Sequence, residues 1–256
     1  MYWQNLRLVD ARALTGTSGV ETVDLPESGI LSSMDIRFDA IEDEATRNLI
    51  KGQIDCLTKI EVVHMGTQVI KSYTGRVARG IGFLDDQRIP FAQRGYAALG
   101  VSGYVYVPIN FGRRQRDTEY AIDLSRLIDP KLKITWDCTI TDPYTGGGFH
   151  STTPVAQLTV ITHTVRDLAV PPKGYIKTSQ VKEYGIAAST IEDVKFPLGN
   201  PYRRIIIRPF EETAGTWGQS IPKWLLSKIE LDINDGEKKP VQMKDEDYVN
   251  AYLRDY

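Results

Sequence analysis

The chain has 256 residues, of which 41% are hydrophobic, 25% charged and 9% aromatic. These are ordinary globular values, so the composition excludes a disordered, collagen-like or disulfide-scaffold chain. The 31 Lys and Arg residues nearly balance the 33 Asp and Glu residues, and the net charge of −2 excludes a generally basic nucleic-acid binder. The length leaves room for one large domain or two small ones.

The sequence shows neither a membrane span nor a secretory signal. Its longest apolar runs are strand-sized, well short of the ~18 residues that a spanning helix needs. The N-terminus has no basic segment followed by an apolar one. Cys56 and Cys138 stand far apart, which excludes a disulfide framework and suits a reducing compartment. We expect both to be small core residues.

The first half of the chain is predicted to be mainly β. Asp43 could cap a helix through residue 57, although Gly52 weakens it. Two alternating segments then flank Met65-Gly66-Thr67, which predicts a β-hairpin there. Residues 103–109 are rich in β-branched and aromatic side chains and predict a further strand.

The second half continues the pattern. A short helix is predicted from Asp117 to Leu127, and residues 132–140 and 155–162 alternate as strands. Alternation places four side chains of the first of these strands on its buried face: Ile134, Trp136, Cys138 and Ile140. Acidic residues at 245–247 suit the start of a C-terminal helix. Many strands with few helices predict an all-β fold, a β-sandwich or jelly roll.

An internal repeat divides the chain. Thr58-Lys59-Ile60-Glu61-Val62 resembles Ser227-Lys228-Ile229-Glu230-Leu231, and Ile36-Arg37-Phe38 aligns with Ile205-Ile206-Ile207 at the same offset of 169 residues (229 − 60 and 205 − 36). Val23-Asp24-Leu25-Pro26 resembles residues 194–197 with a slip of two residues. This order predicts tandem jelly rolls with short connecting helices: residues 1–168 as the first, with an N-terminal arm, and residues 169–256 as the N-terminal part of a second.

The second copy is shorter than the first. About 106 residues follow Ile60 up to Arg166, whereas 27 follow Ile229 (166 − 60 and 256 − 229). We therefore expect an incomplete second jelly roll, with strands at residues 204–208 and around 229, a hairpin turn around Asn234-Asp235-Gly236, and exposed apolar side chains after about Val170. We expect protease to digest it back towards Pro171-Pro172. An incomplete reading frame is the interpretation that this pattern favours.

Certain motifs resemble a known family. Residues 106–113, Tyr-Val-Pro-Ile-Asn-Phe-Gly-Arg, precede Asp117-Thr118-Glu119-Tyr120-Ala121-Ile122-Asp123-Leu124 and the alternating strand at 132–140. This succession, with the Val-x-Leu-Pro entry at Val23, resembles the double-jelly-roll major capsid proteins of tailless icosahedral viruses, in particular the phage members of the adenovirus-type lineage.

The resemblance implies a structural capsid protein with no enzymatic activity, no cofactor and no specific small-molecule ligand. It implies homotrimeric, pseudo-hexagonal capsomers that are made in the host cytoplasm and located in the virion. The partners implied are the chain itself, as trimer and lattice, with minor capsid or penton proteins and an internal membrane or genome as further candidates. Two similar units in each of three chains give six similar lateral faces, which suits a flat lattice.

The densest basic cluster supplies the candidate site. Arg113, Arg114 and Arg116, followed by Asp117, are candidates for an inter-subunit contact. The same residues could instead form a solvated loop, or contact an underlying membrane or genome.

Catalytic and metal sites are not predicted. His64, His150 and His163 lack metal-ligand spacing, and a Cys138/His163 dyad has no supporting motif. Gly146-Gly147-Gly148 is followed by neither a Lys-Ser/Thr pair nor a helix, so it predicts a surface loop and no phosphate site. The alternative function is a carbohydrate-binding jelly-roll module that would use Trp136, Trp217 and Trp224 and the loop at 146–150.

Overall fold

The computed structural model describes residues 1–41, 52–93, 102–140, 149, 156–183, 191–208, 226–233 and 237–244. It divides into two compact units, Met1–Pro197 and Leu198–Tyr256. Each unit is described separately below. No helix in the described ranges is long and apolar enough to cross a membrane.

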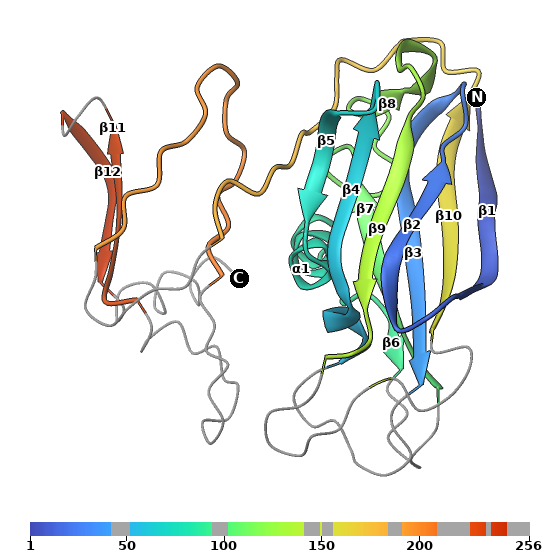
Figure 1. The fold of residues 1–256 in the computed structure, drawn as a ribbon. Coiled ribbons are helices and arrows are strands. Elements are labelled where there is room, and N and C mark those ends of the chain that lie inside the picture. The colour runs from blue at the N-terminus through green and yellow to red at the C-terminus, as the bar shows by residue number, and fades with distance from the viewer. Residues whose placement is uncertain are drawn as a thin grey trace. The chain divides into compact units, whose positions relative to one another are not determined.

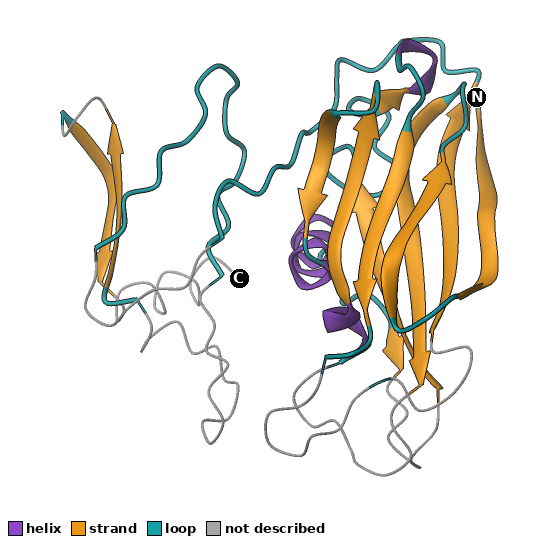
Figure 2. Cartoon of the chain, in the orientation of Figure 1, coloured by secondary structure: helices purple, strands orange, loops and turns teal. Residues whose placement is uncertain are grey.

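The first unit contains two antiparallel sheets that face each other (Figures 1 and 2). In the first sheet the order is β1-β10-β3-β7-β6, and the short strand β8 pairs with β3. Its strands are β1 (Tyr2–Leu14), β3 (Ile30–Ile41), β6 (Ala92–Gln93), β7 (Ser102–Asn110), β8 (Ile122–Asp123) and β10 (Ala156–Arg166).

The second sheet has the order β2-β9-β4-β5. Its strands are β2 (Ser18–Asp24), β4 (Leu57–His64), β5 (Gln68–Tyr73) and β9 (Lys131–Asp137). Among the eight long strands, the first, eighth, third and sixth therefore form one sheet, and the second, seventh, fourth and fifth form the other. This order is that of a jelly roll, and it confirms the all-β fold class predicted from the sequence.

The core lies between the sheets. Met34, Ile36 and Phe38 of β3 are fully buried, and in the opposite sheet Ile134 and Trp136 of β9 are buried too. Cys138 is likewise buried, while Ile140 is partly buried against this core. The predicted buried face of this strand is confirmed, because a period of two sends alternate side chains inward.

The hairpin prediction is confirmed and the helix predictions are corrected. β4 and β5 pair up to His64 and Gln68, with Met65 to Thr67 as the turn. Of the helix expected at 43–57, residues 43–51 lie outside the described residues. Residues 53–56 form a 3-10 helix, η1 (Gln53–Cys56).

The helix predicted from Asp117 to Leu127 is wrong. Its residues form a loop, strand β8 and the three-residue 3-10 helix η2 (Leu124–Arg126). The Asp117 side chain accepts from the Glu119 and Tyr120 N–H groups, as a helix N-cap would. The helix does not continue, because the Ala121 N–H donates to the Gly174 carbonyl at 2.8 Å and Ile122–Asp123 pair with β3. The predicted helix at 245–253 lies outside the described residues.

One helix was not predicted. α1 (Gly75–Asp86) follows β5 and packs against β7, and it carries three glycines, which disfavour helices. Two of them are needed for close packing: a Cβ on Gly82 would lie 2.3 Å from Pro108 Cγ, and one on Gly75 would lie 2.7 Å from the Ile54 carbonyl oxygen. Tertiary contact therefore overrides local preference here.

After β10, residues 173–178 form a strap that runs back along the first unit. The Ile176 N–H donates to the Phe111 carbonyl at 2.8 Å, and the Thr178 N–H donates to the Ile70 carbonyl at 3.1 Å. Ser72 N–H donates to the Thr178 carbonyl at 2.9 Å, so the strap covers the outer edge of β5. These contacts explain why the compact units divide after Pro197, whereas the sequence placed the boundary after residue 168.

In the second unit, β11 (Lys228–Ile233) and β12 (Lys238–Lys244) form an antiparallel pair, with Ile229 opposite Met243. The turn predicted around Asn234-Asp235-Gly236 lies outside the described residues. Residues 204–208 are not assigned to a strand, contrary to expectation. Exposed apolar side chains do follow Val170, including Ile191 at 94% and Leu198 at 98% exposure. That this unit is a second jelly roll, with its strands matching those of the first, stays a prediction.

Candidate functional site

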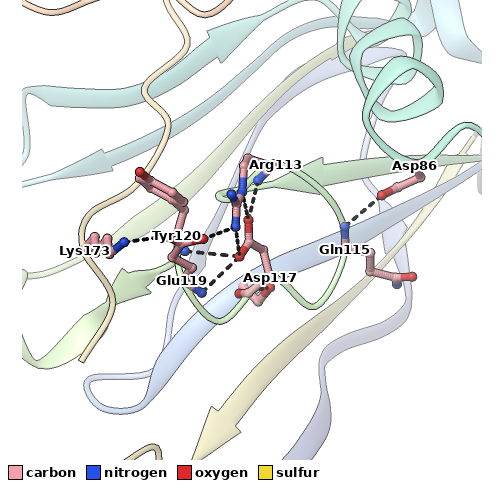
Figure 3. Close-up of polar contacts among 8 residues, drawn as sticks. Asp86, Arg113, Gln115, Asp117, Glu119, Tyr120 and Lys173 are labelled. Carbon is pink, nitrogen blue, oxygen red and sulfur yellow. Dashed lines mark hydrogen bonds and ion pairs between the residues drawn. The ribbon is translucent and has the colours of Figure 1, made fainter. Parts of the chain in front are cut away.

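The loop of residues 111–120, which follows β7, is built around the carboxylate of Asp117 (Figure 3). This side chain is 5% exposed. It accepts hydrogen bonds from the backbone N–H groups of Arg113 at 2.9 Å, Glu119 at 3.0 Å and Tyr120 at 3.3 Å. Gly112 is required at the start of the loop, because a Cβ there would lie 2.3 Å from the Tyr120 carbonyl oxygen. The loop is therefore held in one conformation by its own acid.

An ion-pair chain extends from this centre. Arg113 Nε donates to Asp117 Oδ2 at 2.9 Å, and the same guanidinium pairs with Glu119 and lies over the Tyr120 ring. Lys173 of the strap completes the chain, with its Nζ 2.6 Å from Glu119 Oε1 (Figure 3). The loop and the strap are thus joined by charge as well as by backbone hydrogen bonds.

The electrostatics agree with this geometry. Burial of Asp117 is the largest single influence and raises its pKa, but the hydrogen bonds from Arg113, Tyr120 and Glu119 outweigh it and lower the pKa to about 2. The hydrogen bond from Lys173, followed by that from Arg113, lowers the pKa of Glu119. Both carboxylates are therefore ionised at neutral pH.

A second acid holds the middle of the loop. Asp86, the last residue of α1, accepts from the Gln115 N–H at 2.8 Å and from the Asn110 side-chain amide at 3.2 Å (Figure 3). The loop is therefore held against both α1 and the strap.

Two of the four predicted site residues face outward. Arg114 and Arg116 are exposed, and the guanidinium carbon of Arg116 lies 5.7 Å from the centre of the Trp3 ring on β1. Arg113 and Asp117 are instead brought together as the brace. The basic run revealed the loop, but Asp86 and Lys173 were missed because they lie 29 and 54 residues from their partners.

The described histidines, His64 and His163, belong to strands and not to this loop. His163 on β10 bridges Asn5 at 2.8 Å and Asp35 at 2.9 Å on the neighbouring strands of the first sheet. His64 is on β4 of the second sheet, and His150 lies outside the described residues. Across the described ranges no three His, Cys, Asp or Glu side chains are grouped as metal ligands.

The two thiols are neighbours in the core. Cys56 and Cys138 are fully buried and not disulfide-bonded. Burial, then the hydrogen bond with Cys138, raises the pKa of Cys56 well above its ordinary value. The dyad interpretation is wrong, because both ring nitrogens of His163 are engaged by Asn5 and Asp35 and neither contacts Cys138.

Of the residues expected for a sugar groove, the two that the structure describes are buried. Trp136 is 3% exposed and belongs to the core, and Phe149 from the loop at 146–150 is fully buried. Trp217, Trp224 and Gly146 to Gly148 lie outside the described residues.

Comparison with known proteins yields no matching family model and no matching curated protein. Solved structures do match. The major capsid protein of Sulfolobus turreted icosahedral virus is 11% identical with a TM-score of 0.47, covering 66% of this chain and 50% of that one.

A virion structure of the same virus matches at 12% identity and a TM-score of 0.46, covering 65% of this chain and 46% of that one. The capsid of the virus PBCV-1 matches at 11% identity and a TM-score of 0.43, covering 64% of this chain and 41% of that one. This chain spans half or less of each of those proteins. The likeness concerns the fold, and these structures belong to the class that the sequence motifs resemble, the double-jelly-roll major capsid proteins.

Proposed function

We propose that this chain is a structural subunit of an icosahedral viral capsid and acts by self-association, without catalysis. The observation that carries the proposal is the strand order of the first unit, an eight-stranded jelly roll followed in the same chain by a second β unit. Jelly rolls occur in viral capsid proteins, lectins and cupins. The buried position of Trp136 removes one of the residues on which the lectin alternative relied.

The proposed assembly is a homotrimer with a pseudo-hexagonal outline, located in the virion. Two jelly rolls in each of three chains would present six similar sides, which supports packing into a flat lattice. Within this assembly the braced loop is proposed as an inter-subunit contact: Arg113 and Asp117 shape it, and Arg114 and Arg116 face the partner.

The test is the native mass of the full chain, measured by mass photometry and sedimentation from nanomolar to micromolar concentration. A trimer, and sheets or shells by electron microscopy at higher concentration, would support a capsid subunit. A monomer at every concentration that binds a glycan array would overturn the proposal in favour of the carbohydrate-binding module. The parallel glycan measurement makes both outcomes informative.

A further inference from the structure

A second charged surface lies at residues 24–27 and 129, here called the acidic corner. Asp24 ends β2 and is 82% exposed, and Asp129, just before β9, is 60% exposed. Lys131 Nζ lies between them, 3.5 Å from Asp24 and 3.3 Å from Asp129, and Glu27 is exposed nearby in the chain. One cation therefore faces two carboxylates, which gives these three side chains a net charge of −1, while the Arg166 guanidinium donates to Ser28 Oγ at 3.2 Å next to Glu27.

The acidic corner and the arginine loop lie at the same end of the sandwich. The loop begins after Asn110, which pairs with Ser33 near the start of β3. The corner lies between the end of β2 and that same start of β3, and the Leu25 N–H donates to the Pro130 carbonyl at 3.0 Å. Two surfaces of opposite charge thus share one level of the jelly roll.

The two surfaces belong to different sheets. Arg116 lies over Trp3 of β1, in the first sheet, whereas Asp24 and Lys131 belong to β2 and β9, in the second. Among the described residues, Asp24 and Asp129 pair with Lys131, and Arg116 lies over Trp3, so the two surfaces do not pair with each other within the unit. Two different, complementary surfaces are what a head-to-tail contact between copies requires, and such contacts form a ring when the rotation between copies closes.

We infer that Arg114 and Arg116 of one copy bind the acidic corner of a neighbouring copy of the same chain. This inference rests on the proposed self-association and names its contact. The hydrogen bonds to Asp117 and Asp86 fix the backbone that carries both arginines, and the Arg116 guanidinium lies over Trp3. Such complementarity sets the register and partner choice of an interface more than its strength.

A second copy fits better than an anionic lipid or a nucleic acid. Binding to those surfaces increases with the number of cations that reach phosphate. Here Arg113 is paired with Asp117 and Glu119, so two outward cations remain in a run of three arginines. The chain as a whole carries a net charge of −2, which disfavours approach to a polyanion.

The test is a charge exchange in the full chain. One variant carries Arg114→Glu and Arg116→Glu, a second carries Asp24→Lys and Asp129→Lys, and a third carries all four changes. We expect each double variant to weaken self-association by roughly tenfold or more, because like charges then face each other at every contact. The fourfold variant should assemble again, because reversing both surfaces restores their complementarity.

Lys59→Glu with Lys133→Glu is the control for the arginine variant, since it makes the same change in net charge on β4 and β9, the central strands of the second sheet. Circular dichroism and thermal unfolding check that all variants fold. Raising the salt concentration from 0.1 M to 1 M, which shortens the screening length from about 10 Å to about 3 Å, should weaken the wild-type contact.

The outcomes separate the two proposals. A wild-type chain that never self-associates contradicts the proposed function. A wild-type oligomer that is unaffected by both double variants, or a fourfold variant that does not recover, overturns this inference alone. The inference also fails if Arg114→Glu with Arg116→Glu leaves the oligomer intact but abolishes binding to phosphatidylglycerol vesicles or to duplex DNA.

Discussion

Asp117 shows how a single buried carboxylate can hold a surface loop in shape. Asp117→Ala leaves three backbone N–H groups and the Arg113 guanidinium without their acceptor. We expect the jelly roll to lose roughly 2–3 kcal/mol, measured as the free energy of unfolding in urea by tryptophan fluorescence. Asp10→Ala, at a site 66% exposed, is the control and should change it by no more than about 0.5 kcal/mol. Equal effects of the two variants would show that the brace is not structural.

The same residue predicts a dependence on pH. The folded-state pKa of Asp117 is about 2, below its ordinary value of 3.8, so folding favours the ionised form. The stabilisation is complete above pH ~4 and is lost as the pH falls towards 2. The difference in unfolding free energy between wild type and Asp117→Asn should therefore shrink by roughly 2 kcal/mol between pH 6 and pH 2. A difference that stays constant over this range would contradict the assignment.

At the scale of elements, α1 offers a matched pair of substitutions. Gly80 is exposed with open space around its Cα, whereas a Cβ on Gly82 would lie 2.3 Å from Pro108. Gly80→Ala should stabilise the unit by roughly 0.5–1 kcal/mol through helix propensity. Gly82→Ala should destabilise it by roughly 1–3 kcal/mol through overpacking. Thermal unfolding of both variants checks the pair. If Gly82→Ala is more stable than the wild type, α1 does not pack this closely against Pro108.

The strap can be tested through the edge strand it covers. Thr178→Pro removes the N–H that donates to Ile70 and displaces the carbonyl that accepts from Ser72. We expect the Ser72 amide to exchange its hydrogen at least about tenfold faster, measured by NMR or mass spectrometry. Thr178→Val keeps the backbone bonds and serves as the control. Unchanged exchange in the proline variant would mean that the strap does not protect β5.

The elements also show what could be predicted from the sequence. The Met65–Thr67 hairpin and the strands predicted for the first unit have local signals, turn residues and alternation, and they are confirmed, whereas residues 204–208 do not form the strand predicted for them. α1 and the strap were missed because their causes are contacts with distant residues, Pro108 and Ile70. The arginine loop was found by its charge density. Its division into brace and outward side chains depends on where the Asp117 carboxylate points, which spacing alone does not reveal.

At the scale of the whole molecule, the strap changes where a protease is expected to cut the chain. Digestion back to Pro171-Pro172 was expected from the sequence, but residues 173–178 are hydrogen-bonded to the first unit. We now expect thermolysin, used sparingly, to leave a resistant fragment that ends between residues 179 and 197, identified by its intact mass. A stable fragment that ends near Pro172 would show that the strap opens readily in solution.

The buried thiols of Cys56 and Cys138 can report how often the jelly roll opens. Alkylating reagents attack the thiolate, and here burial both blocks access and raises the pKa of Cys56. Labelling can therefore proceed only as fast as the two sheets separate around η1 and the end of β9. The kinetics of that labelling would report, without any added probe, how often the sandwich opens before and after copies of the chain assemble.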